Sequence, residues 1–409
     1  ATPLAGRHFA AAIAYLLAAS IGIVWIAPDI ALGAYASPHV AGVTHLITLG
    51  WISVTIFGAL CQLLPVALGS PLRWMGGARL TLLTFAPGAG IFALGIATGI
   101  TALNPVGLLL LTTGIVTAAI NVGASLHRSK QRDVTWAAIA LAMSFLVSTL
   151  ILGAILLHNL HSGFIADARF RVLGTHLHIA LVGWALMMIV GVSHRLLPMF
   201  LLSHGADTSW TRRSIVMLSM GLVFLVSGLL GKVASAAWVG AILLEVGVAC
   251  FYWQVRCFYR SRVKKKTDIG LMFVTGALIS LGASAILGPV LLAKGPTHGR
   301  LATAYIALGL LGGITMYVVG LYYKIVPLLA WTTRYGSRMG KEKLPAVTDM
   351  YSARVAWLQL GSMFLAVTLL FAGIAAASPH VARCGAVLFL GGVLLFAGQI
   401  ARIAYGGPA

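Results

Sequence analysis

The chain of 409 residues is 60% hydrophobic and 9% charged, with a formal net charge of +20 and a mean hydropathy of +0.98. This composition excludes an ordinary water-soluble domain and is typical of a polytopic membrane protein. Its four cysteines lie at no spacing that predicts a zinc site or a disulfide framework. The first apolar run lacks a basic leader, so we expect no cleavable signal peptide.

Apolar windows of roughly 20 residues, the length that crosses a ~30 Å hydrocarbon core, predict twelve membrane spans and an all-α fold in one transmembrane domain over residues 1–409. The predicted spans are 8–27, 41–66, 78–99, 105–126, 134–157, 173–199, 214–231, 236–257, 269–292, 300–329, 353–376 and 381–403.

Basic residues gather in alternate loops, which sets the expected orientation. The richer loops hold Arg128, Lys130, Arg132, Arg212, Arg213, Arg256, Arg260, Arg262, Lys264, Lys265, Lys266, Arg334, Arg338, Lys341 and Lys343. The positive-inside rule places these loops and both termini in the cytoplasm, in a bacterial inner membrane. We interpret the charge as a topology signal and as contact with lipid headgroups, and expect no nucleic-acid partner.

Comparing the chain with itself reveals a repeat. Span two and span six match at a constant offset of 133 residues, at His45 and His178, Gly50 and Gly183, Trp51 and Trp184, Gly58 and Gly191, and Pro65 and Pro198. Span ten matches span six at a further offset of 129, at Gly312, Gly320 and Pro327, with Ala307 at the histidine position. These offsets predict a pseudo-threefold arrangement of four-helix repeats, approximately 1–132, 133–267 and 268–409. The prolines are expected where these helices end, and the glycines should let a neighbouring helix or a flat macrocycle approach.

The two matched histidines are the first candidate site. His45 and His178 each precede their proline by 20 residues, about 30 Å of helix, which places both just inside the outer leaflet. A histidine inside a span is costly without a partner, and two at one depth suit the axial positions of a haem iron. Hydrogen bonding between helices and the lining of a polar cavity are the alternatives.

Three further features extend this site. His176 lies two positions before His178, so it points to nearly the opposite side of the helix and can ligate a second haem. His298 is its candidate partner in span ten, but in a continuous helix it lies about 43 Å from Pro327, outside the hydrocarbon unless the loop bends inward. Arg169 and Arg171 can pair with haem propionates or with lipid headgroups. We expect His39, His158, His161 and His380 in exposed loops.

The pattern resembles subunit I of the heme-copper oxidases, a family with twelve spans in three four-helix arcs. The His176-Leu177-His178 motif with Pro198 is similar to the His-x-His motif on that family's tenth span, although here it lies on the sixth. The resemblance implies a low-spin haem b shared by His45 and His178 and a second haem on His176. Because the motif is shifted by one repeat, His178 can instead face span ten. The family's copper requires histidines on span seven; residues 215–231 here contain none, so we expect no such copper centre.

We therefore expect a membrane haem protein of respiratory electron transfer, with one or two haems b and a periplasmic cytochrome c or another respiratory subunit as partner. The alternatives are a gas-reducing oxidoreductase acting on NO or O2, a haem protein of nitric oxide response, a secondary transporter, and a haem-free assembly or structural subunit. Transporters favour charged residues near mid-membrane, and Glu245 is the single carboxylate within a predicted span.

Overall fold

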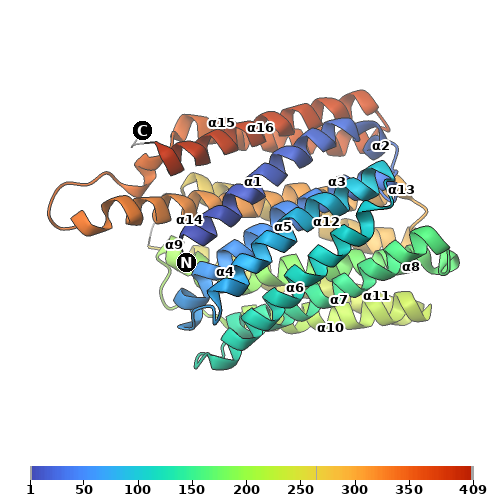
Figure 1. Ribbon diagram of the computed structural model, residues 1–409, viewed down its shortest axis with the longest axis horizontal. Coiled ribbons are helices and arrows are strands. Elements are labelled where there is room, and N and C mark those ends of the chain that lie inside the picture. Colours follow the sequence, from blue (N-terminus) through green and yellow to red (C-terminus); the bar gives the residue numbers. More distant parts are fainter. Residues whose placement is uncertain (1, 264, 407–409) are drawn as a thin grey trace. The chain divides into compact units, whose positions relative to one another are not determined.

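The computed structural model describes residues 2–263 and 265–406, so Lys264 of the basic loops lies outside the described residues. Across the described ranges the chain is helical, apart from an isolated antiparallel bridge between Ser203 and Arg262. Twelve helical segments in these ranges are long and apolar enough to cross a membrane (Figure 1). The prediction of an all-α, twelve-span membrane protein is confirmed.

Nine of the spans are single α-helices. They are α1 (Thr2–Trp25), α5 (Met75–Thr98), α6 (Leu103–Arg128), α7 (Val134–Ser162), α10 (Ser209–Gly231), α11 (Ala234–Arg260), α12 (Ile269–Lys294), α15 (Ala353–Ala375) and α16 (Pro379–Tyr405). The short elements are α2 (Ala27–Ala31) and the 3-10 turns η2 (Ala166–Ala168), η5 (Gly336–Arg338) and η6 (Val347–Met350). Several helices extend past the predicted spans, because hydropathy marks only the part of a helix that is apolar.

Spans two, six and ten are built differently, each from two α-helices with a π-helix between them. They are α3 (Pro38–His45), η1 (Leu46–Ser53) and α4 (Val54–Leu68); α8 (Arg169–His178), η3 (Ile179–Leu186) and α9 (Met187–Leu201); and α13 (Gly299–Ala307), η4 (Leu308–Thr315) and α14 (Met316–Tyr335). In their most apolar stretches 78%, 67% and 72% of residues are buried, against at most 56% in the other nine spans. These three are therefore the inner helices.

The described chain divides into two compact units. The first comprises Ala1–Ala12, Thr48–Lys265 and Gly288–Thr297. Within it, α5 packs against α6 and α10 against α11 as hairpins (Figure 1). Glycines allow the close approach: a Cβ added at Gly107 would lie 2.7 Å from the Cα of Phe92, and one at Gly240 would lie 2.2 Å from the nitrogen of Leu225.

The second unit comprises Ile13–Ile47, Lys266–Leu287 and His298–Ala409. Here α15 and α16 form the corresponding hairpin, and a Cβ added at Gly373 would lie 2.5 Å from the nitrogen of Ala382. The N-terminal end of α13 contacts the turn after α2 at Gly33, whose φ is +83. The backbone of Arg300 lies so close to Gly33 that no side chain would fit there. The positive φ and the close backbone contact each require a glycine at this position.

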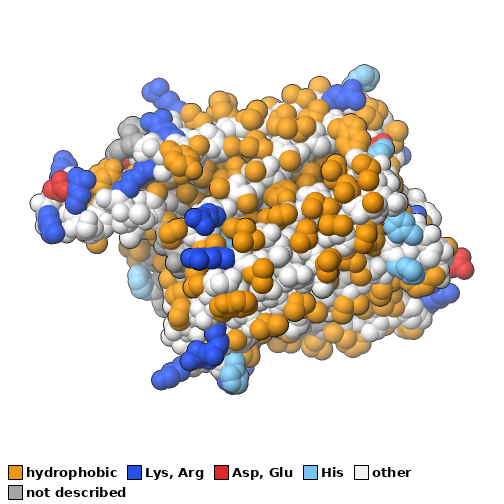
Figure 2. Space-filling view, in the orientation of Figure 1, with side chains coloured by type: hydrophobic (Ala, Val, Ile, Leu, Met, Phe, Trp, Pro, Cys, Tyr) orange, Lys and Arg blue, Asp and Glu red, His pale blue; other side chains and the backbone are white. Residues whose placement is uncertain are grey.

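The surface is that of a membrane protein. Large apolar side chains are exposed along the helices, among them Val66 at 75%, Ile286 at 71% and Leu83 at 70%. Figure 2 shows hydrophobic side chains over the visible helices, with Lys and Arg gathered mainly near helix ends. Lipid is the solvent that such a surface fits.

The prediction that the repeated prolines lie at helix ends holds for Pro65 and Pro198, which are in the last turns of α4 and α9, and is wrong for Pro327. Pro65, Pro198 and Pro327 lie inside α4, α9 and α14, with three, three and eight further helical residues after them. Each lacks an N–H, so one carbonyl in the preceding turn loses its intrahelical partner. Inside membrane helices this loss is tolerated when neighbouring helices and side chains satisfy the carbonyl.

Candidate functional site

Each of the three inner helices changes to π geometry directly after the repeated histidine position. His45 is the last residue of α3 and His178 the last of α8, while Ala307 ends α13. The π segments begin at Leu46, Ile179 and Leu308, offsets of 133 and 129 residues, the same as those of the sequence repeat. A π-helix is rare and frequently marks a functional site.

The imidazoles of His45 and His178 are held in the same way. Nδ1 of His45 donates to the carbonyl of Ala41 at 2.7 Å, and Nδ1 of His178 donates to the carbonyl of Gly174 at 2.7 Å. A carbonyl can only accept, so in each neutral ring the proton is on Nδ1 and the lone pair is on Nε2. Both side chains are half-buried. A histidine that ligates a metal commonly has this arrangement, with one ring nitrogen donating to a backbone carbonyl.

His8 shows that this hydrogen bond alone does not make a histidine a metal ligand. Nδ1 of His8 donates to the carbonyl of Leu4 at 2.9 Å, in the same pattern. His8, however, is 1% exposed and packs on α4, where a Cβ added at Gly58 would lie 2.6 Å from its own Cβ. The carbonyl bond therefore orients a histidine without making it a ligand, and the half-buried position within an inner helix distinguishes His45 and His178.

His176 faces α7. Its ring lies beside Gly153, where an added Cβ would be 3.3 Å from Cε1. His176 and His178 thus occupy different sides of α8, as their spacing predicts. The two arginines also lie on different sides of α8. Arg169 precedes His176 by seven residues, and Arg171 precedes His178 by seven. Seven residues are nearly two full turns and about 10 Å of helix, so each arginine lies on the stripe of one histidine.

His298 stands in a different environment from the other candidate ligands. It is exposed and directly precedes α13, whose first residue is Gly299. The structure does not carry His298 into the helix, and Ala307 occupies the repeated position in span ten.

The exposed histidines expected in loops lie instead at helix ends. His158 and His161 are in the last turns of α7, and His39 and His380 are in the first turns of α3 and α16. The Ser-Pro-His-Val segments are helix starts: the hydroxyls of Ser37 and Ser378 accept from the nitrogens of Val40 and Val381 at 3.3 and 3.4 Å. Serine followed by proline is a known helix-start pattern, so the sequence contained this information.

Packing around the inner helices recurs along the chain. Cβ atoms added at Gly58, Gly191 and Gly320 would meet His8 of α1, Ala138 of α7 and Gly270 of α12, at 2.6, 2.4 and 2.6 Å. Each of these is the span before the inner helix. At these repeated glycines, therefore, the preceding helix takes the space next to the backbone.

Two residues that sequence reasoning did not assign to the site join spans two and six within the first unit. The indole Nε1 of Trp184 donates to Oγ of Ser53 at 2.9 Å, and that hydroxyl donates to the carbonyl of Thr48 at 2.8 Å. The Trp184 ring also lies 5.8 Å from that of Phe57, centroid to centroid. The repeat singled out Trp184 but contained no information about its partner.

Within the described ranges, no three His, Cys, Asp or Glu side chains come together in a group able to hold a metal ion. A haem iron needs only one or two protein ligands, so a haem site does not require such a group.

No protein-family model matches the sequence, and no curated protein matches it. Among solved structures the chain is similar to a heme-copper terminal oxidase dimer determined by cryo-EM. The TM-score is 0.65, the sequence identity is 10%, and the match covers 99% of this chain and 85% of that one. At this identity the similarity shows the fold alone. The chain has a heme-copper oxidase subunit I-like fold, as the resemblance in its sequence predicted.

Proposed function

We propose that this chain is an integral membrane haem protein of respiratory electron transfer, in which His45 and His178 are the axial ligands of one haem b. The observation that carries the proposal is that both histidines stand half-buried at the repeated position, directly before the π segment of an inner helix, with Nδ1 held by the carbonyls of Ala41 and Gly174. A haem held by these two histidines would supply one-electron transfer. The oxidase-like fold supports this function over a transporter.

The pairing of span two with span six rests on the bond between Ser53 and Trp184. Ser53 lies eight residues after His45, and Trp184 lies six after His178. Two helices joined at this point favour the pairing of His178 with His45 over one with span ten, where Ala307 replaces the histidine. Phe57 against Trp184 adds apolar contact to the same junction.

Arg171 and Arg169 are the proposed partners of haem propionates. Each lies about 10 Å along the helix before a histidine, so its guanidinium would pair with the propionates of a haem held by that histidine. Because the basic loops lie at the opposite helix ends, we place this end of the helices at the periplasmic face of a bacterial inner membrane, with both termini cytoplasmic. A cytochrome c or another respiratory subunit is the proposed electron partner on that face.

His176 is the proposed ligand of a second haem, on the other side of α8. Its ring lies against α7 at Gly153, which has no side chain between its backbone and the ring. A haem held by His176 alone would have an open coordination position, and the protein would then belong with the gas-reducing enzymes. We propose no copper centre, and we do not include His298 as a ligand because it is exposed outside α13.

The test is spectroscopy of the purified full-length protein. A pyridine haemochrome assay and low-temperature electron paramagnetic resonance should show a low-spin haem b. His45→Ala and His178→Ala should each abolish the same low-spin signal, whereas His161→Ala and His380→Ala, at exposed helix ends, should leave it intact.

Three results would contradict this proposal. A preparation without haem would exclude a haem protein, and loss of the signal in only one of the two variants would exclude the pairing. For His176, carbon monoxide should shift the spectrum of the ferrous protein and fail to do so in His176→Ala. A carbon monoxide response that survives in His176→Ala would exclude His176 as the ligand of the open site.

A further inference from the structure

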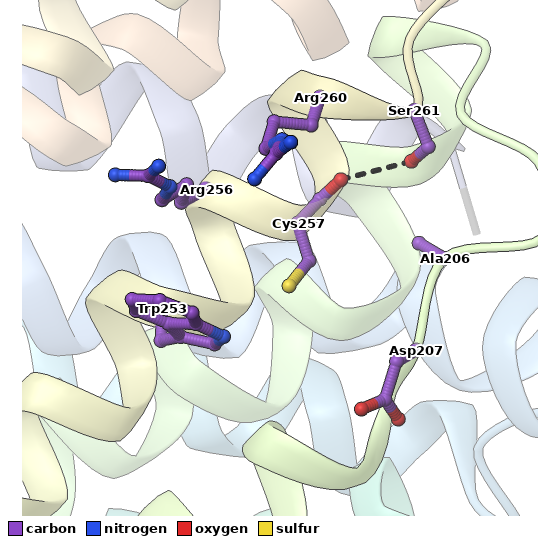
Figure 3. Close-up of a pocket in the computed structure, with 7 residues that line it drawn as sticks. All are labelled: Ala206, Asp207, Trp253, Arg256, Cys257, Arg260 and Ser261. Atoms are coloured by element: carbon purple, nitrogen blue, oxygen red, sulfur yellow. Dashed lines mark hydrogen bonds between the residues drawn. The ribbon is translucent and has the colours of Figure 1, made fainter.

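A cavity of about 390 Å³ lies at the C-terminal end of α11, in the first unit (Figure 3). One wall is formed by Trp253, Arg256 and Arg260 on α11, and the other by the segment that joins α9 to α10, with Asp207. The loop charges predict that this end of α11 is cytoplasmic, opposite to the proposed haem.

The cavity carries uncompensated positive charge. Arg256 and Arg260 are exposed, and neither has an acidic partner within the part of the chain that the structure describes. The guanidinium of Arg256 lies 5.3 Å from the centre of the Trp253 ring, so the arginine has a cation–π contact.

The single carboxylate in the wall is already satisfied. Asp207 accepts from the nitrogen and the hydroxyl of Ser209 at 2.9 and 3.0 Å. These two hydrogen bonds, with the charge of Arg213, lower the pKa of Asp207 below its usual range. Two arginines against one aspartate leave the lining with a net charge of +1.

Exposed apolar side chains form a stripe along α11 that ends at the arginines of the cavity. Ile242, Val246 and Trp253 are 58%, 43% and 47% exposed on α11. At about 100° per residue, these three positions and Arg260 fall within roughly 40° of one another on the helix. The stripe therefore runs from the middle of the predicted span to the arginine heads, a length that fits an acyl chain below a headgroup.

We propose that this cavity binds the headgroup of an anionic phospholipid, with the phosphate on Arg256 and Arg260 and an acyl chain along Ile242, Val246 and Trp253. A basic pocket beside transmembrane helices on the cytoplasmic side is a form of site that recognises anionic lipids. A soluble phosphate ester would use the arginines but not the apolar stripe, so the stripe favours a lipid.

The experiment is native mass spectrometry of the full-length, delipidated protein in detergent, titrated with phosphatidylglycerol or phosphatidylcholine. Wild type should retain phosphatidylglycerol in preference to phosphatidylcholine. At about 1 kcal/mol for each basic side chain, the double variant Arg256→Gln/Arg260→Gln should weaken phosphatidylglycerol binding about thirtyfold. The matched control is Arg79→Gln/Arg128→Gln, which removes two exposed arginines at other helix ends outside the cavity.

Cys257 provides a second measurement, because its sulfur points into the cavity (Figure 3). In a Cys384→Ser background, which removes the exposed cysteine, bound phosphatidylglycerol should slow maleimide labelling of Cys257. Inorganic phosphate alone should not slow it.

The proposal is overturned if the two double variants lose phosphatidylglycerol equally, since the binding would then be general attraction to basic residues. Equal retention of phosphatidylcholine would exclude an anionic preference. Protection of Cys257 by inorganic phosphate to the same degree would replace the lipid by a soluble anion. None of these results depends on haem.

Discussion

Spans six and ten have the same backbone plan and different chemistry. Each is an α-helix, a π segment and a second α-helix, with a glycine against the preceding span and a proline inside the last helix. Span six has His178 directly before its π segment, and span ten has Ala307. The π segment therefore does not need an imidazole. The comparison indicates that helix packing maintains the repeated backbone, and that a histidine is a separate addition at a position that this backbone provides.

We expect the largest effects at the glycine contacts, which test whether helix packing maintains the repeated backbone in both spans. Gly191→Ala would place a Cβ 2.4 Å from Cβ of Ala138, and Gly320→Ala would place one 2.6 Å from the carbonyl oxygen of Gly270. We expect each to lower the free energy of unfolding by about 1–3 kcal/mol through overpacking. Thermal unfolding in detergent measures the change.

The control is Gly391→Ala on α16, where an added Cβ meets nothing within 4 Å. Alanine should stabilise that helix slightly, by about 0.5–1 kcal/mol. If Gly191→Ala were destabilising and Gly320→Ala neutral, the two spans would not share one packing principle.

The indole bond is a feature of span six that span ten lacks, since Gly313 takes the place of Trp184. Trp184→Phe removes the donor to Ser53 and should cost about 1 kcal/mol, the typical net value of a hydrogen bond. A double-mutant cycle with Ser53→Ala, followed by chemical unfolding, should return a coupling of similar size. Additive effects of the two substitutions would show that this bond does not hold spans two and six together.

Gly153→Ala tests whether the proposed haem at His176 is independent of the one held by His45 and His178. Its Cβ would lie 3.3 Å from Cε1 of His176, so the ring must move by a few tenths of an ångström. If the proposed haems are correct, the carbon monoxide spectrum that depends on His176 shifts while the low-spin signal of His45 and His178 does not. Gly123→Ala on α6, with open space at its Cβ, should change neither spectrum. A shift of both signals would indicate a single coupled haem site.

The smallest expected effect is at the helix starts, where the inner helices differ. Span two begins with the serine cap of Ser37, whereas Ala168 and His298 precede α8 and α13 without a side-chain cap. Ser37→Ala should lower stability by about 0.5–1 kcal/mol, and Ser378→Ala at the matching segment by a similar amount. His380→Ala, exposed in the second segment, should be near neutral in the same unfolding assay. A large effect of His380→Ala would show that the segment has a role beyond capping.

Composition and local pattern determined the class of this protein, because the lipid core requires about 20 apolar residues per helical span whatever the tertiary contacts. The twelve spans followed from that requirement, and the oxidase-like fold was implied by the resemblance that His176, His178 and Pro198 carry. The spacing of His176 and His178 also placed them on different helix sides, since that depends only on helical geometry.

Tertiary structure decided the rest. No local pattern predicts that the helices become π-helical after His45, His178 and Ala307, or that α14 continues for eight residues beyond Pro327. Both arrangements leave or displace backbone hydrogen bonds and depend on neighbouring helices for compensation. The partner of Trp184 is 131 residues away in the chain, and the ring of His176 lies beside a glycine of another helix. The sequence by itself determined which segments are membrane helices and which residues repeat; only packing between distant segments decided which side chain meets which.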